Sequence, residues 1–467
     1  MGEAFSQMAV QGDIVQEQTQ GMTKLLFRGR ICHSLSASQL EIIHDGLLGV
    51  EDGIITFLYE FADVENQDLE LFLRNEGYGD AEFVHLSPEQ FLFPGMIDTH
   101  IHAPQYPNAG IGLDLPLLDW LEKYTFPTES SMRDPSRATE VYSRIVAQTM
   151  RQGTTLACYY SSIHSEATNI LADLCMKAGQ RAFIGKCNMD GLSPDHYRET
   201  CSDSLEATKA CIQHVRQIDP IGEQLTYCIT PRFAPSCSRE LMRGLGELAS
   251  AEQLPIQTHI SENKAEVEMV KGMFPECSSY TNIYDTYGLL TQRTILAHAI
   301  YLAPDELELV KSKGSGISHC PASNTAISSG ECPVREILDM DISIGLGTDM
   351  SGGYTASILD AAKLACSVSR HRVIHTGQKD LMLGVSEALY MATLGGARVC
   401  NLQSKLGNFT SGKFFDALLI DLGRQRNGRV DIFEGESDQI AIEKWVFNGD
   451  DRNIARVYVS GKIVLQN

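Results

Sequence analysis

Eight short apolar runs, each followed by an amphipathic stretch, fill the middle of this sequence. The runs are FLFPGMIDTHIH, TTLACYY, RAFIGKCNM, LTYCITP, PIQTHIS, TILAHAI, SGISHC and DISIGLGTD. Strands that alternate with helices build a parallel sheet, and eight such repeats are what a (β/α)8 barrel requires. We therefore predict an α/β protein with a TIM-like barrel. An open, doubly wound sheet gives the same alternation and is the alternative.

The two ends of the chain have a different pattern. Short, β-branched, turn-bounded runs occupy Leu25 to Leu92 and return at 417–421, 445–447 and 456–464, and such runs predict strands. A helix is expected around 66–80. These patterns predict a small β-sandwich domain built from both chain ends. The expected division is a polar arm at 1–24, the first part of the β domain at 25–91, the barrel at 92–405 and the second part of the β domain at 406–467.

The charge balance excludes some classes of partner. The chain carries 38 basic and 60 acidic side chains, for a net charge of −22, whereas binding to nucleic acid needs clustered Lys and Arg. No apolar run approaches the roughly 20 residues of a membrane helix, and residues 1–24 lack the apolar core of a secretory signal. The 13 cysteines include no CxxC pair. We expect a cytoplasmic protein with reduced thiols.

Metal-ligand side chains end several of the predicted strands. His100 and His102 close the first run two residues apart, so both imidazoles face the same way in an extended strand. His259, His298 and Asp349 end three later runs. An HxH pair alone is weak evidence for a metal site. Side chains at the carboxyl ends of different barrel strands, however, all point into the same mouth of the barrel. The pattern predicts a catalytic zinc site with a position left for water.

Glu262 lies three residues after His259 and is a candidate proton carrier. A water molecule made acidic by a metal needs a proton acceptor, and the leaving group needs a proton donor. One carboxylate beside the metal can serve as both. The alternative is a Glu at a helix start, favoured by the helix dipole, because NKAEVEMVKGMF is typical of a helix.

The same motifs resemble a known family. PGMIDTHIHAPQY, HISEN, the His at 298, HCPASN and GLGTDMSGG resemble the amidohydrolase superfamily, and DLPLLDWLEKYTFP, TPRFAPSCS and GDDRNI are similar to the guanine deaminase family within it. The similarity extends from about Phe91 to Ile454. It implies hydrolysis of guanine to xanthine and ammonia with one Zn²⁺ per chain, and a homodimer.

The resemblance also implies roles for individual residues. Metal ligands are expected at His100, His102, His259 and Asp349, with His298 either a fifth ligand or a residue that holds the water. The expected catalytic residues are Glu262, His298 and Asp349. Substrate contacts are expected from Gln105, Arg232, Phe233, His259, Glu262 and Asp349. An Arg donor suits the O6 oxygen of guanine and opposes the 6-amino group of adenine.

The resemblance also implies one metal per site. Superfamily members with two metals use a carboxylated Lys from the fourth strand, whereas the fourth run here, LTYCITPRF, carries Arg232 and no Lys. Two other functions stay open: deamination of a related heterocycle such as 8-oxoguanine, and a barrel that has lost catalysis and serves as a scaffold. A lid that excludes water is expected in Asn108–Phe126 or in the 319–330 loop.

Overall fold

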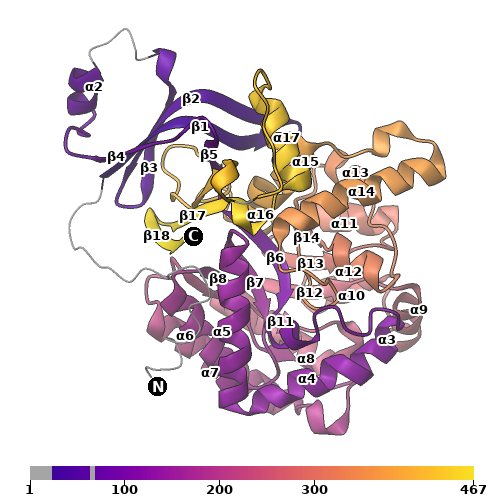
Figure 1. Ribbon diagram of the computed structural model, residues 1–467. Coiled ribbons are helices and arrows are strands. Elements are labelled where there is room, and N and C mark those ends of the chain that lie inside the picture. The colour runs from indigo at the N-terminus through magenta and orange to yellow at the C-terminus, as the bar shows by residue number, and fades with distance from the viewer. Residues whose placement is uncertain (1–23, 64–68, 427) are drawn as a thin grey trace.

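The computed structural model describes residues 24–63, 69–426 and 428–467. Strands from both chain ends gather on one side of the molecule, and parallel strands with their helices form the rest (Figure 1). The described chain begins inside a strand at Lys24, so the predicted arm lies otherwise outside the described residues.

The strands of the chain ends form one eight-stranded sheet with the order β18-β17-β16-β5-β1-β2-β3, and β4 pairs with β1. The aromatic rings of Phe27 on β1 and Tyr458 on β17 lie 5.6 Å apart although two strands separate them in the sheet, so the sheet curls back on itself. The strands are β1 (Lys24–Ser36), β2 (Gln39–Glu51), β3 (Ile54–Glu60), β4 (Glu82–His85), β5 (Gln90–Pro94), β16 (Ala417–Asp421), β17 (Ile454–Val459) and β18 (Lys462–Gln466).

Each predicted apolar run contains a parallel strand. The first run divides at Gly95, because β5 belongs to the antiparallel sheet and β6 to the parallel one; the sheet of the chain ends therefore reaches Pro94, beyond the expected boundary at 91. The parallel strands are β6 (Met96–His102), β7 (Thr154–Tyr160), β8 (Arg181–Gly185), β9 (Cys187–Asn188), β10 (Leu225–Tyr227), β11 (Thr230–Pro231), β12 (Ile256–Ile260), β13 (Thr294–His298), β14 (Gly316–His319) and β15 (Ile344–Leu346).

Two four-stranded parallel sheets, β10-β8-β7-β6 and β12-β13-β14-β15, meet at both of their edges. On one side the Gln257 amide donates to the Ile229 carbonyl at 2.9 Å, next to a parallel bridge between Ile229 and Ile256. On the other side the Asp349 amide donates to the His100 carbonyl at 2.8 Å. These contacts bring the carboxyl ends of the strands to one face.

Helices follow the parallel strands and cover their outer side (Figure 1). Their apolar faces supply much of the largest buried cluster, including Ile145, Leu171 and Leu245. The longer helices are α5 (Pro135–Arg151), α6 (Ser165–Ala178), α7 (Cys201–Ile218), α8 (Arg239–Glu252), α9 (Lys264–Met273), α11 (Pro304–Lys313), α14 (Ile358–Thr376) and α17 (Asp438–Asn448). The shorter ones are α2 (Leu69–Asn75), α3 (Leu117–Trp120), α4 (Phe126–Ser130), α10 (Tyr280–Thr286), α12 (Pro321–Ala326), α13 (Val334–Asp339), α15 (Val385–Tyr390) and α16 (Gly396–Val399).

The prediction of a strand at 445–447 is wrong, because these residues lie in α17. Trp445 is fully buried and packs its ring against Phe91 and Phe93, with centroids 5.3 and 5.0 Å away. Ile442, Trp445 and Val446 form the helical i, i+3, i+4 stripe that covers this sheet face. A window of three apolar residues is too short to reveal that period. Within the described ranges, no helix has the length and apolarity that a membrane span requires.

Candidate active site

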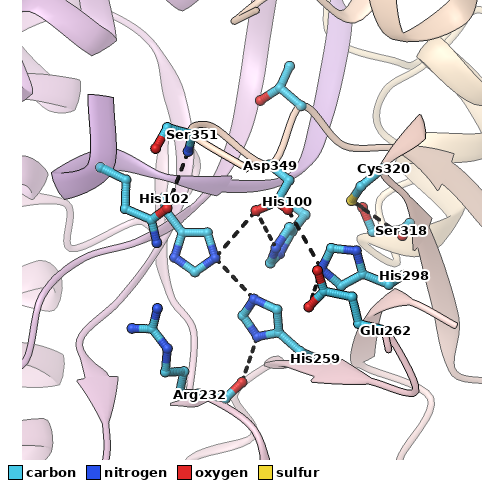
Figure 2. A network of polar contacts seen from close by, with 12 residues as sticks. His100, His102, Arg232, His259, Glu262, His298, Ser318, Cys320, Asp349 and Ser351 are labelled. Atoms are coloured by element: carbon cyan, nitrogen blue, oxygen red, sulfur yellow. Dashed lines mark hydrogen bonds and ion pairs between the residues drawn. The ribbon is translucent and has the colours of Figure 1, made fainter. Parts of the chain in front are cut away.

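Five side chains from four strand ends meet at the carboxyl face of the parallel strands. The ligand atoms of four of them lie within 4.8 Å of one another, and all four side chains are buried. Figure 2 shows the imidazoles and the Asp349 carboxylate turned toward a common point, with His298 and Glu262 alongside. The four-residue group consists of His100 and His102 on β6, His259 on β12 and Asp349 after β15; His298 ends β13.

The orientation of His259 is fixed by the backbone. Its Nδ1–H donates to the Arg232 carbonyl at 2.6 Å, which leaves Nε2 as an acceptor. That atom lies 3.0 Å from His102 Nε2, and His100 Nε2 lies 3.2 Å from Asp349 Oδ1. Neutral imidazole nitrogens that face each other beside a carboxylate are well satisfied by a divalent cation. The residues present therefore fit a metal ion.

The pKa shifts of this cluster favour the protonation states that bind a metal ion. Burial lowers the pKa of His100, and it lowers those of His102 and His259 far below the usual value, so these imidazoles are neutral near pH 7. Burial alone would raise the pKa of Asp349, but contact with His100 and the neighbouring imidazoles lowers it below its usual range. Asp349 is therefore an ionised carboxylate.

Glu262 has the opposite protonation preference. Burial, followed by repulsion from Asp349 and Glu266, raises its pKa well above the usual value. Its Oε2 lies 3.6 Å from His298 Nε2. The adjoining helix does not use Glu262 as its cap: Asn263 is the N-cap of α9, and Glu266 accepts from the amides of Glu262 and Asn263 at 2.8 and 3.0 Å. The Glu262 side chain is thereby left to face the cavity.

His298 is held by a partner that the sequence interpretation did not include. Its Nδ1–H donates to Asn324 Oδ1 at 2.8 Å, which leaves Nε2 as an acceptor. That Nε2 has no hydrogen-bond partner among the described residues and lies 3.7 Å from Asp349 Oδ2. His298 thus belongs to a group with Glu262 and Asp349 rather than to the four-residue group.

The backbone at the strand ends is strained where it presents these groups. His298 and Asp349 have φ values of 73° and 47°, in the left-handed region that non-glycine residues rarely adopt. Asp98 joins two of these strand ends, those of β6 and β15: its carboxylate accepts from the amides of His100 and Thr348 at 3.2 and 3.0 Å and from the Thr348 hydroxyl at 2.5 Å. Strain of this kind concentrates at functional sites.

An open cavity lies beside the cluster. Both segments expected to contain a lid contribute to its wall, through Leu117, Trp120 and Leu121 on one side and Ser323 and Ile327 on the other. Whether either segment moves stays a prediction. The remaining lining residues are His102, Gln105, Arg232, Phe233, His259, Glu262, Asp349 and Gly352.

The residues expected to hold substrate lie together at this cavity. Gln105, Arg232 and Phe233 are all at least 95% buried. Arg232 Nη1 donates to Glu129 Oε2 at 2.7 Å, and Gln105 Nε2 donates to Glu129 Oε1 at 2.8 Å. The sequence interpretation missed Glu129, because it belongs to no metal-ligand pattern and ends no predicted strand.

Asn188 and His319 also lie near the ends of predicted runs, RAFIGKCNM and SGISHC, but they belong to neither the cavity lining nor the four-residue metal group. Asn188 donates to the hydroxyls of Ser204 and Thr208 on α7, at 2.9 and 2.8 Å. His319 lines a second, smaller cavity with Arg335 and Arg372. Side chains alternate along a strand, so a position at a strand end does not by itself decide which side chain enters the mouth.

Neutral imidazoles and an ionised carboxylate at the ends of parallel strands, beside a second carboxyl group of raised pKa, are characteristic of metal-dependent hydrolases. The model of the amidohydrolase family matches residues 91–464. The chain therefore belongs to the amidohydrolase family, and its similar relatives include guanine deaminases.

Three of these relatives illustrate the similarity. A probable guanine deaminase of Schizosaccharomyces pombe is 50% identical, over 95% of this chain and 84% of that protein. The guanine deaminase of Dictyostelium discoideum is 44% identical, over 93% of this chain and 97% of its own length. The crystal structure of guanine deaminase from C. acetobutylicum with bound guanine superposes with a TM-score of 0.86 at 33% identity, over 95% of this chain and all of that one.

Proposed function

We propose that this chain hydrolyses guanine to xanthine and ammonia. The observation that carries the proposal is one cavity that holds a metal-ligand cluster, a carboxyl group of raised pKa and two polar side chains suited to a purine. The names of the relatives agree with it, and one related crystal structure contains guanine in its active site.

A single Zn²⁺ would be held by His100, His102, His259 and Asp349. When bound, it supplies the positive charge that makes a water molecule acidic near neutral pH. His298 lies outside this four-residue group, and its Nε2 is open toward Glu262 and Asp349. We assign it to holding the water rather than to binding the metal. The strand end that carries Arg232 has no Lys for a second metal.

The protein groups then perform the proton transfers. Asp349 and His298 hold the water against the purine carbon that bears the exocyclic amine. Glu262 accepts a proton as the water oxygen attacks that carbon, and it delivers the proton to the amine nitrogen. The C–N bond breaks and ammonia leaves. The second proton of the water passes from the new hydroxyl group to the adjacent ring nitrogen, so the carbon keeps the oxygen as a carbonyl. Because the pKa of Glu262 is raised above that of an ordinary carboxyl group, Glu262 is better suited to accept a proton and to return it.

Arg232 and Gln105 would position the purine, with Phe233 beside them. Arg232 offers only donors, which suits the O6 oxygen of guanine and opposes the amino group of adenine. A buried hydrogen-bonding site rejects the wrong substrate strongly, because that substrate leaves buried groups unpaired. His259, Glu262 and Asp349 would approach the reacting edge of the purine from the metal side.

The architecture proposed for this function is a closed (β/α)8 barrel with a small β-sandwich domain. The hydrogen bonds that join the two parallel sheets at both edges support closure. The curled eight-stranded sheet supports a β domain made from both chain ends, with the expected boundary at 91 moved to Pro94 because β5 belongs to this sheet. The other expected boundary, between the barrel and 406–467, stays a prediction. A homodimer and a cytoplasmic location stay predictions.

Deamination of 8-oxoguanine or another heterocycle is the second candidate function. The pair of Arg232 and Gln105 favours a guanine-like base, but it does not distinguish guanine from its 8-oxo form. A non-catalytic scaffold is disfavoured, because relatives that have lost catalysis are expected to lack ligands, whereas every ligand position here is filled.

The test is an assay of the purified, metal-analysed protein. With about one zinc per chain we expect xanthine and ammonia from guanine, little product from adenine, and loss of turnover with a chelator that zinc restores. 8-Oxoguanine is run in parallel. Bound metal without turnover of guanine would contradict the proposed substrate, and two metals per chain would contradict the single-metal site.

A further inference from the structure

Glu129 is a fully buried carboxylate directly behind the substrate cavity. It lies on α4 and has no exposed surface. Three side chains donate to it: Gln105 Nε2 at 2.8 Å, Arg232 Nη1 at 2.7 Å and the Tyr197 hydroxyl at 2.8 Å. Two of the three line the cavity, whereas Glu129 does not. Glu129 therefore reaches the substrate only through Gln105 and Arg232.

The donor and acceptor roles in these contacts fix the orientation of the Gln105 side-chain amide. An ionised carboxylate only accepts hydrogen bonds, so the NH2 group of Gln105 must face Glu129. The Gln105 oxygen then accepts from the Ser351 amide at 3.3 Å. A flipped amide would place its oxygen against the carboxylate and its NH2 against a backbone N–H. The side-chain amide has one orientation, and the cavity is given a fixed pattern of donors and acceptors.

Glu129 also balances the charge of Arg232. The two side chains are 0% and 4% exposed, and this ion pair is the only one that Arg232 makes in the described part of the chain. Arg232 contacts the Phe126 ring from 5.3 Å, and its Nη1 lies 3.9 Å from Cys187 Sγ, neither of which carries a balancing negative charge. Without Glu129 a buried guanidinium would face the cavity unpaired, and it would attract an anion.

From these contacts we propose that Glu129 is a positioning residue that sets substrate specificity. It holds Gln105 and Arg232 in one donor pattern, and it cancels the charge of Arg232 so that the cavity favours a neutral purine over an anionic one. The inference rests on the proposed function, in which these two side chains bind the purine.

The test compares two purines that lack a 2-amino group and differ in charge. Hypoxanthine is neutral near pH 7, and urate is a monoanion. Their dissociation constants are measured by calorimetry on the zinc-loaded full chain, for wild type, Glu129→Gln, Glu129→Asp and Tyr197→Phe. The kcat and KM for guanine are measured on the same samples. Tyr197→Phe is the matched control, because it removes one hydrogen bond from Glu129 and leaves the ion pair.

Glu129→Gln removes the charge and leaves an NH2 group where an acceptor is needed. We expect weaker binding of hypoxanthine and a preference that shifts toward urate by about tenfold or more, with the loss for guanine mainly in KM. Glu129→Asp keeps the negative charge, but its shorter side chain places the carboxylate farther from Gln105 and Arg232. We therefore expect weaker guanine binding, while the preference between hypoxanthine and urate stays near that of the wild type. Tyr197→Phe changes the preference little.

If Glu129→Gln weakened the binding of hypoxanthine and urate equally, the charge argument would be overturned, because a purely structural role would change both dissociation constants by the same factor. If Glu129→Gln does not fold, Glu129→Asp decides: an unchanged KM for guanine would overturn the positioning role. Wild-type protein that binds hypoxanthine but does not turn over guanine would contradict the proposed function and leave the binding comparison intact.

Discussion

Asp349 and Glu262 are two carboxyl groups at one cavity, and their surroundings shift their pKa values in opposite directions. The imidazoles lower the pKa of Asp349, whereas burial raises that of Glu262. At the scale of the single residue, this divergence separates a permanent anion from a group that can exchange a proton. The two roles arise from the neighbours of each carboxyl group, since the chemical group is the same.

Glu262→Gln removes the proton carrier and keeps the size of the side chain. Because Glu262 is outside the four-residue metal group, we expect normal zinc content and a fall in kcat of about 10²–10⁴-fold. Glu268→Gln, on the exposed face of α9 with a side chain 72% exposed, is the control and should keep full activity. Near-normal turnover of Glu262→Gln would remove Glu262 from the mechanism.

Asn324→Ala removes the acceptor that fixes the ring of His298. We expect kcat to fall by about 10–100-fold with zinc retained, because partners that orient imidazoles at metal sites have effects of this size. Asn324→Asp keeps an acceptor at the same distance and should retain more activity than the alanine variant. Equal activities of the two variants would show that the hydrogen bond does not position His298.

At the scale of the element, the ends of β6, β14 and β15 approach so closely that the chain needs glycine between them. A Cβ atom on Gly347 would lie 2.6 Å from Ser318 Oγ, 2.8 Å from the His100 Cβ and 2.9 Å from Cys320 Sγ. Atoms of this kind do not approach so closely without displacement. The position of His100 therefore depends on the absence of a side chain at 347.

Gly347→Ala should displace His100 and weaken zinc binding. We expect a lower zinc content per chain after dialysis against a weak chelator, and lower thermal stability. Gly272→Ala is the control: it lies in α9 with nothing within 4 Å of the added Cβ, and alanine there stabilises a helix by up to about 1 kcal/mol. Wild-type zinc affinity in Gly347→Ala would contradict the close packing of these strand ends.

Sequence patterns predicted the elements that repeat and missed those that depend on distant contacts. Periodicity located all eight apolar runs and the His and Asp positions that end them. It could not divide the first run at Gly95, since the break depends on which sheet accepts each half. Glu129 escaped detection for the same reason: its partners Gln105, Tyr197 and Arg232 are 24, 68 and 103 residues away in the chain.

At the scale of the whole molecule, a buried ion pair joins the parallel strands to the sheet of the chain ends. Arg181 begins β8, and its Nε donates to Asp416 Oδ2 at 2.7 Å, just before β16; both side chains are 4% exposed. Asp416 also accepts from the Ser460 amide at 2.9 Å, and the guanidinium lies 4.3 Å from the centre of the Phe414 ring. The two parts of the fold are thus coupled by charge as well as by apolar packing.

Asp416→Asn leaves the Arg181 guanidinium buried without its counter-charge. Removing one partner of a buried pair costs about 3–5 kcal/mol, so we expect a large fall in the urea midpoint of unfolding. Glu140→Gln is the control, because Glu140 pairs with Arg137 and Arg144 on the surface, where such pairs contribute less than about 1 kcal/mol. Below the unfolding transition, zinc content and guanine turnover per folded chain should match the wild type, because the pair lies outside the cavity lining. If the urea midpoint of Asp416→Asn equalled that of Glu140→Gln, the parallel strands and the sheet of the chain ends would be held together without the Arg181–Asp416 pair.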